Sequence, residues 1–180
     1  MNLSTSRKKL PLLLLLAFLF SQCSLFKIPE EERSPYAGRE EGGAIATTED
    51  RLRMDIIQYA EQFLGTPYQY GGMSPKTGFD CSGFTAYVLN RYDINVSHSS
   101  AAQEKEGKKV RLKDVQPGDL IFYRRGGPLS KVFHVSMVAE NDSDGITVIH
   151  SVNSGVIKEN ITTSSYWAPL VSSARTVISR

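Results

Sequence analysis

The segment GFDCSGF, residues 78–84, places a single cysteine where a helix is expected to begin. Asp80 is a favourable N-cap residue, because its carboxylate accepts hydrogen bonds from free backbone amides. In the residues that follow, Phe84 and Val88 lie at helical spacing. Cys81 is therefore predicted in the first turn of a helix whose apolar face enters the core. The segment alone leaves four roles open for this cysteine: a buried small hydrophobe, half of a disulfide, a metal ligand or a nucleophile.

The chain around this segment predicts a domain of helices followed by strands. A helix is expected over residues 47–65, where threonines offer N-caps, apolar residues recur on one face and a glycine ends the run. A short third helix is expected over residues 98–107. The expected strands, which alternate or are rich in β-branched residues, are 115–124 (after a turn), 131–140, 145–151, 154–160 and 173–180. This order favours the α+β class, with N-terminal helices packed on an antiparallel sheet.

The N-terminus has the pattern of an export signal, predicted to span residues 1–22. Three basic residues, Arg7, Lys8 and Lys9, precede an unbroken apolar run at residues 10–20. That run is shorter than the roughly 20 apolar residues that span a bilayer comfortably. A permanent membrane helix is the alternative interpretation of this segment.

Cys23, the other of the two cysteines in the chain, follows the apolar run directly. Its position resembles the lipid-attachment site of bacterial lipoproteins. Lipidation there would anchor the protein to a membrane and would exclude a disulfide with Cys81. Gln22 and Phe20 differ from the small residues that usually flank the cleavage point, so secretion without a lipid stays open.

The rest of the chain divides into a linker and one domain. Residues 23–50 carry the lipid-attachment cysteine and a segment rich in charge, proline and glycine, which cannot bury enough apolar surface to fold alone. Residues 51–180 are long enough for one domain with one core. The chain has a net charge of +2, and loss of the three basic residues of the predicted signal leaves −1. No basic stripe of the kind that binds nucleic acid is present in the sequence.

Two histidines lie in strands that are predicted to form a hairpin. Folded about Asp142, this hairpin places His134 directly opposite His150 on one face of the sheet. A slip of one residue would place them on opposite faces, and the loop length permits either register.

Together with the cysteine, these histidines predict a hydrolytic triad. Cys81 would be the nucleophile, His134 its base, and His150 the group that orients the base. The helix terminus and the base predict a lowered thiol pKa, and the free amides there can hold an oxyanion. A nucleophile on a helix that packs against a sheet carrying the base is the papain-like arrangement.

Each of these residues also has a structural interpretation. A cysteine within a helix, or a histidine on an apolar strand, commonly belongs to the core. Tyr68 and Tyr70, in the loop before the cysteine, can be loop packing or site residues. One cysteine with two histidines can bind zinc, but the closely spaced ligand pairs of zinc sites are missing, so no metal is predicted.

Six motifs occur in one order across residues 66–151, namely PYQYGG, GFDCSGF, SSAAQ, QPGDLIFY, HVSMV and VIHS. Together they resemble the NlpC family of cell-wall cysteine peptidases, and the combination of DCSGF, GDL and a following HV is specific. The tail segments SGVIKEN, YW and ARTVISR resemble the lipoprotein murein endopeptidases of that family, the MepS type. The resemblance covers essentially all of residues 51–180 and implies a papain-like cysteine peptidase fold.

The resemblance implies a role for each matching residue. Cys81 matches the nucleophile of the family, His134 its general base and His150 its orienting residue. The matches that line the site and hold the oxyanion or the substrate are Tyr68, Asp80 and Ser82. Family members hydrolyse peptide bonds in peptidoglycan stem peptides without a cofactor. The expected partners are therefore these peptides, a membrane through a lipid on Cys23, and a regulatory envelope protein, and the expected location is the bacterial cell envelope facing the peptidoglycan.

Several features leave the specificity open. His98 stands where the family often has an arginine, so recognition of substrate charge is open. The polar linker is too short for a wall-binding module, so recognition is expected within the catalytic domain. Two bonds are candidates, the D,D cross-bridge between stems and the γ-D-glutamyl–diaminoacid bond within one stem. The alternative functions are an amidase or acyltransferase on the same fold and a non-catalytic, envelope-binding lipoprotein.

Overall fold

The computed structural model describes residues 46–178. The predicted signal peptide, the lipid-attachment residue Cys23 and most of the predicted linker lie outside the described residues. Within the described range, no helix combines the length and the apolar character that a membrane crossing requires. The fold and the site are therefore those of the C-terminal part of the chain.

The two longer helices begin at capping residues that the sequence predicts. The Thr47 side chain accepts a hydrogen bond from the amide of Asp50, and the Asp50 carboxylate accepts one from the amide of Thr47. Asp80 caps the second helix by accepting from the amide of Gly83 at 2.7 Å. The helices are α1 (Thr48–Glu61), α2 (Cys81–Asn90) and α3 (Ser100–Gln103), with 3-10 turns at Leu112–Asp114 and Ala168–Leu170.

Six strands form one antiparallel sheet, in the order β3-β8-β4-β5-β6-β7. They are β3 (Lys108–Val110), β4 (Leu120–Arg124), β5 (Val132–Asp142), β6 (Gly145–Val152), β7 (Gly155–Asn160) and β8 (Val171–Thr176), and a small ribbon of β1 (Met73–Ser74) and β2 (Gly78–Phe79) precedes α2. The α+β class and the meander from β5 to β7 are thus confirmed. β3 was not predicted, because its residues carry no clear apolar alternation.

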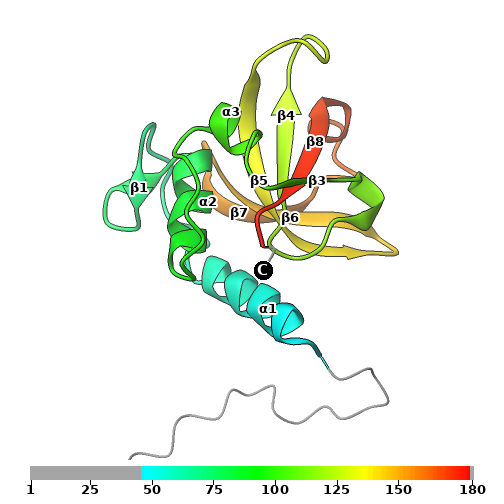
Figure 1. Ribbon diagram of the computed structural model, residues 1–180. Coiled ribbons are helices and arrows are strands. Elements are labelled where there is room, and N and C mark those ends of the chain that lie inside the picture. Colours follow the sequence, from blue (N-terminus) through cyan, green and yellow to red (C-terminus); the bar gives the residue numbers. More distant parts are fainter. Residues whose placement is uncertain (1–45, 179–180) are drawn as a thin grey trace, which may run out of the picture. The chain divides into compact units, whose positions relative to one another are not determined.

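Both faces of the sheet are buried at its central strands, such as β4. Leu120 and Phe122 of β4 pack with α1 and α2, and Figure 1 shows α2 alongside the sheet with the β1 ribbon beyond it. Ile121 and Tyr123 point to the other face, where they pack with Trp167. The predicted alternation along β4 is therefore confirmed, and the two faces form separate apolar clusters.

The register of the β5–β6 hairpin differs from the prediction. The turn joins Asp142 to Gly145, and a β-bulge at Ala139 shifts the pairing, so that Met137 lies opposite Ile149. Continued along the strands, this register places His150 opposite residue 136, so His134 is its diagonal neighbour and not its direct partner. Without the bulge, the register set by the turn would pair His150 with Met137. The His150 side chain would then lie on the other face of the sheet from His134. The bulge therefore keeps both histidines on one face.

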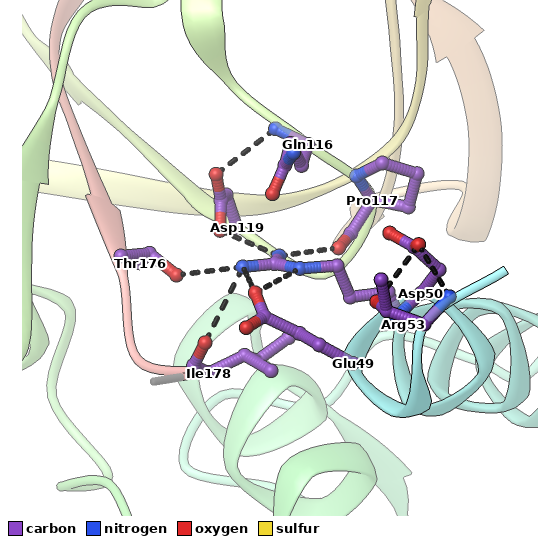
Figure 2. Close-up of polar contacts among 9 residues, drawn as sticks. Glu49, Asp50, Arg53, Gln116, Pro117, Asp119, Thr176 and Ile178 are labelled. Atoms are coloured by element: carbon purple, nitrogen blue, oxygen red, sulfur yellow. Dashed lines mark hydrogen bonds and ion pairs between the residues drawn. The ribbon is translucent and has the colours of Figure 1, made fainter. Parts of the chain in front are cut away.

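A buried arginine ties α1 to the sheet (Figure 2). Arg53 is 5% exposed, and its guanidinium donates to Asp119 at 3.0 Å and to the Pro117 carbonyl at 2.9 Å. The same guanidinium also donates to the Thr176 hydroxyl at the end of β8 and to the Ile178 carbonyl just after it. Asp119 is the acid of the GDL motif, so this motif joins the first helix to the start of β4.

Candidate active site

Cys81 is the first residue of α2 and lies where a loop closes over the helix terminus. The Asp80 carboxylate connects the helix terminus to this loop. One of its oxygens accepts a hydrogen bond from the Gly83 amide of α2 at 2.7 Å, and the other accepts one from the Gly71 amide of the loop at 3.0 Å. Gly83 has no room for a side chain, since a Cβ built on it would lie 2.0 Å from the carbonyl oxygen of Gly72. The PYQYGG and GFDCSGF motifs therefore meet in one tight contact that positions the thiol.

Burial is the main influence on the acidity of the Cys81 thiol. Removal from water raises the thiol pKa, and the negative charge of Asp80 raises it further. The backbone of Val135 and the amides of Ser82 and Cys81 act in the opposite direction, because they stabilise the thiolate. Burial prevails, so the prediction of a lowered thiol pKa is wrong, and Cys81 rests as a neutral thiol at neutral pH.

The structure brings the two predicted histidines into contact. Nε2 of His134 on β5 lies 3.0 Å from Nδ1 of His150 on β6. His150 is fully buried and His134 is 6% exposed. Tyr123, which lies opposite His134 on β4, packs against its ring with centroids 5.4 Å apart and shares a hydrogen bond with Ser136. The pair is thus enclosed on the sheet face opposite the helices.

Glu159 and Trp167 complete the surroundings of the histidine pair. The other ring nitrogen of His150, Nε2, lies 2.8 Å from a carboxylate oxygen of Glu159 on β7. The indole N–H of Trp167 donates to the same oxygen at 2.8 Å. The indole also stacks on His134, with centroids 4.7 Å apart and planes 25° apart. Both histidines are therefore held by hydrogen bonds and by ring contacts.

Burial sets the protonation state of His134. It lowers the pKa of this imidazole to about 3, and the neighbouring His150 and Arg125 lower it further in the same direction. Arg125 lies with its guanidinium carbon 4.4 Å from the centre of the Phe133 ring, next to His134 in the chain. At neutral pH, His134 is a neutral imidazole that is able to accept a proton.

The thiol lies against β5, the strand that carries His134. The backbone of Val135, the residue after His134, lies close enough to the Cys81 thiol to lower its pKa. In the described residues 46–178, no hydrogen bond joins the thiol to either histidine. Such contacts are commonly long in the absence of substrate and shorten when it binds. The thiol of α2 thus lies against the residue that follows His134 on β5, and it makes no hydrogen bond to the His134 ring.

The residues predicted to bind substrate fall into two groups. Tyr68 lies near the thiol, because burial and then the charge of a Cys81 thiolate raise the pKa of its phenol. Ser82 is buried, and its hydroxyl donates to Asp80 and to the carbonyl of His98. Ser82 and Asp80 thus make contacts within the protein that hold the helix terminus, whereas the His98 side chain is exposed.

Glu159, Trp167 and Arg125 were not predicted as site residues. Glu159 lies in SGVIKEN and Trp167 in YW. These two segments were linked to function only because they resemble the tail of the murein endopeptidases. Knowing the β6–β7 register would have placed Glu159 diagonally from His150, but that register comes from the folded sheet.

Among residues 46–178, no group of three or more histidine, cysteine, aspartate or glutamate side chains is arranged to hold a metal ion.

Comparison with known proteins gives consistent matches. The model of the NlpC/P60 family matches residues 65–176. A gamma-DL-glutamyl hydrolase of Bacillus subtilis is 36% identical over 123 residues, which cover 68% of this chain and 29% of that protein. A probable endopeptidase of Haemophilus influenzae is 34% identical over 120 residues, or 64% of this chain and 70% of that protein.

Solved structures agree with these sequence matches. The crystal structure of an NlpC/P60 family protein from Bacillus cereus superposes with a TM-score of 0.64 at 29% identity. The match covers 71% of this chain and 40% of that one. The chain thus spans less than a third of the Bacillus subtilis hydrolase, 29%, and most of the Haemophilus influenzae protein, 70%.

Proposed function

Because this chain belongs to the NlpC/P60 family, we propose that it is a cysteine peptidase that hydrolyses peptide bonds in the stem peptides of peptidoglycan. Cys81 is the nucleophile, His134 is the general base, and His150 orients His134. One observation carries the proposal: a thiol at the N-terminus of α2 lies against the backbone of Val135 on β5, next in the chain to His134, whose ring contacts that of His150. The papain-like fold, with its nucleophile on a helix and its base on a sheet, supports the same assignment.

The first half of the reaction forms an acyl-enzyme. His134 takes the thiol proton as the sulfur of Cys81 attacks the peptide carbonyl carbon and the S–C bond forms. The resulting oxyanion lies near the free amides at the start of α2, with the phenol of Tyr68 as a further donor. The imidazolium then returns the proton to the amine of the substrate as the C–N bond breaks, and the amine leaves.

The second half of the reaction restores the enzyme. A water molecule gives a proton to His134 as its oxygen attacks the thioester carbon, and the S–C bond breaks. The acid product leaves, and the proton on His134 returns to the sulfur of Cys81. A neutral thiol and a neutral imidazole thus begin and end each cycle, which agrees with the raised pKa of Cys81 and the lowered pKa of His134.

The bond that is cleaved lies within or between stem peptides. The names of two Bacillus subtilis relatives, a gamma-DL-glutamyl hydrolase and a gamma-D-glutamyl-L-lysine dipeptidyl-peptidase, favour the γ-D-glutamyl–diaminoacid bond within one stem. The tail segments that resemble murein endopeptidases favour the D,D cross-bridge between two stems. Asp80 and Ser82 serve either reaction by holding the helix terminus, and Asp80 also holds the loop that carries Tyr68.

The test uses the full chain and cross-linked muropeptides, with products identified by mass spectrometry. We expect cleavage by the unmodified chain and none by Cys81→Ala. The matched control is Cys23→Ser, which removes the other cysteine of the chain and should cleave soluble muropeptides normally. Conversion of dimers to monomers identifies the cross-bridge, and shortened stems identify the γ-glutamyl bond. Cleavage that persists in Cys81→Ala would refute the proposed nucleophile.

We also propose that the protein is exported and anchored to a membrane by a lipid on Cys23, facing the peptidoglycan. The apolar run at residues 10–20 followed at once by this cysteine supports the anchor. Metabolic labelling with a fatty acid should mark the unmodified chain and leave Cys23→Ser unmarked. Equal labelling of both chains would refute the attachment site.

A further inference from the structure

A chain of hydrogen bonds continues past the two histidines to Glu159. We propose that Glu159, held by Trp167, is a positioning residue that fixes the tautomers of both histidines, so that Nδ1 of His134 is the basic nitrogen. The proposal rests on the proposed function, because it concerns the base of the same reaction. We refer to His134, His150 and Glu159 as the relay.

The relay crosses three neighbouring strands on a regular diagonal. Along β5, His134 lies two residues from the position opposite His150, by continuation of the β5–β6 register. Along β6, His150 lies two residues from Val148, the partner of Glu159 on β7. Diagonal neighbours are about 7–8 Å apart between Cα atoms, within reach of long side chains. The hydrogen bonds of the relay, 3.0 and 2.8 Å, follow from this repeated offset.

The polarity of these hydrogen bonds determines where each proton lies. An ionised carboxylate only accepts hydrogen bonds, so the contact with Glu159 requires the proton of His150 on its Nε2. A neutral imidazole carries one N–H, so Nδ1 of His150 has a lone pair and accepts from Nε2 of His134. His134 therefore keeps its lone pair on Nδ1. Burial lowers the pKa of both rings, which keeps both neutral at neutral pH.

Trp167 holds the relay in this state from two sides. Its indole N–H can only donate, so the hydrogen bond to Glu159 requires an acceptor there and supports the same proton order. Two donors, from Trp167 and His150, thus converge on one carboxylate oxygen. The stacked indole limits rotation of the His134 ring, and Trp167 itself is 8% exposed and well packed.

The relay also compensates charge during the reaction. When His134 takes the thiol proton it becomes a buried cation, which the Glu159 carboxylate stabilises through His150. This cation is absent from the free enzyme and from the bound substrate complex. Loss of Glu159 should therefore lower kcat more than it changes KM.

The experiment compares three variants of the full chain. Glu159→Ala removes the acceptor, whereas Glu159→Gln keeps an acceptor oxygen but removes the charge. Glu140→Gln is the matched control, because Glu140 is an exposed acid of β5 that binds Lys158 and does not contact the relay. Nitrogen-15 NMR of the histidine side chains reports which ring nitrogen carries the proton, and it needs no substrate. Hydrolysis of muropeptides then gives kcat and KM.

We expect the unmodified chain and Glu140→Gln to show His134 protonated on Nε2 only. Glu159→Ala should show a mixture of tautomers and a kcat lowered roughly 10–100-fold, as is typical when an orienting partner is removed from behind a reacting group. Glu159→Gln should keep the tautomers and show a smaller fall in kcat. If Glu159→Ala fails to fold, the tautomer of His134 in the unmodified chain still tests the proton order, and an unchanged kcat in Glu159→Gln would refute the role of the Glu159 charge.

Two results would overturn the inference. One is an unmodified chain whose His134 carries its proton on Nδ1, and the other is a Glu159→Ala chain with unchanged tautomers and unchanged kcat. If the unmodified chain cleaves no muropeptide, the proposed substrate fails, but the NMR result still decides the role of Glu159. The two failures are therefore distinguishable.

Discussion

Acid should destabilise this fold through His134, because its buried imidazole resists protonation. Burial, with His150 and Arg125 acting in the same direction, lowers the pKa of His134 from 6.5 to about 3. Below pH 6.5 the unfolded chain binds a proton at this residue and the folded chain does not. Stability that is fully present above pH 6.5 is therefore lost progressively down to about pH 3. Between pH 7 and pH 4.5, the loss from His134 alone is roughly 2–3 kcal/mol.

Urea unfolding at pH 7 and at pH 4.5, followed by circular dichroism, measures this loss. The comparison variant is His134→Gln, which cannot titrate and keeps an amide that can donate to His150. We expect the unmodified chain to lose roughly 2–3 kcal/mol more than the variant over this interval. Every other titrating group is present in both chains. Equal losses in the two chains, or an NMR titration that protonates His134 near pH 6.5, would refute the burial argument.

Three further predictions follow from the same structure. Alkylation of Cys81 should have a pH midpoint above that of an unstructured peptide thiol, because burial raises its pKa; a lower midpoint would indicate a resting ion pair. Gly83→Ala should lower the melting temperature sharply and reduce cleavage, because the new Cβ would lie 2.0 Å from a loop carbonyl. Asp119→Ala should cost about 3 kcal/mol in urea unfolding, because Arg53 loses its buried acidic partner. Glu49→Gln removes the half-exposed acid that pairs with the same arginine and should cost under about 1 kcal/mol.

The sequence predicts well what depends on near neighbours in the chain. The caps at Thr47 and Asp80 are confirmed, because a capping side chain bonds to amides only three residues away. The opposite orientations of Leu120 and Ile121 are also confirmed, since alternation is a property of any strand. These local rules suffice for most of the order of helices and strands, and hence for the α+β class.

The sequence predicts poorly what depends on how strands align. A hairpin folded about Asp142 gives the right partners but the wrong register, because the turn centre and the bulge at Ala139 leave no clear local pattern. The acidity of Cys81 was also predicted in the wrong direction. The helix terminus is visible in the sequence, but the burial that outweighs it is not.

By itself, the sequence determined the class of the fold and the helical start at Cys81, and it predicted two histidines on one face of the sheet, whose rings the structure brings into contact. Only the tertiary structure decided that Glu159 and Trp167 join them. The physical reason is that a hydrogen bond between strands requires a register, and register is set by turns, bulges and packing across the whole sheet. Burial likewise depends on every layer of the fold, so the neutral resting state of the thiol and the imidazole is a property of the assembled domain.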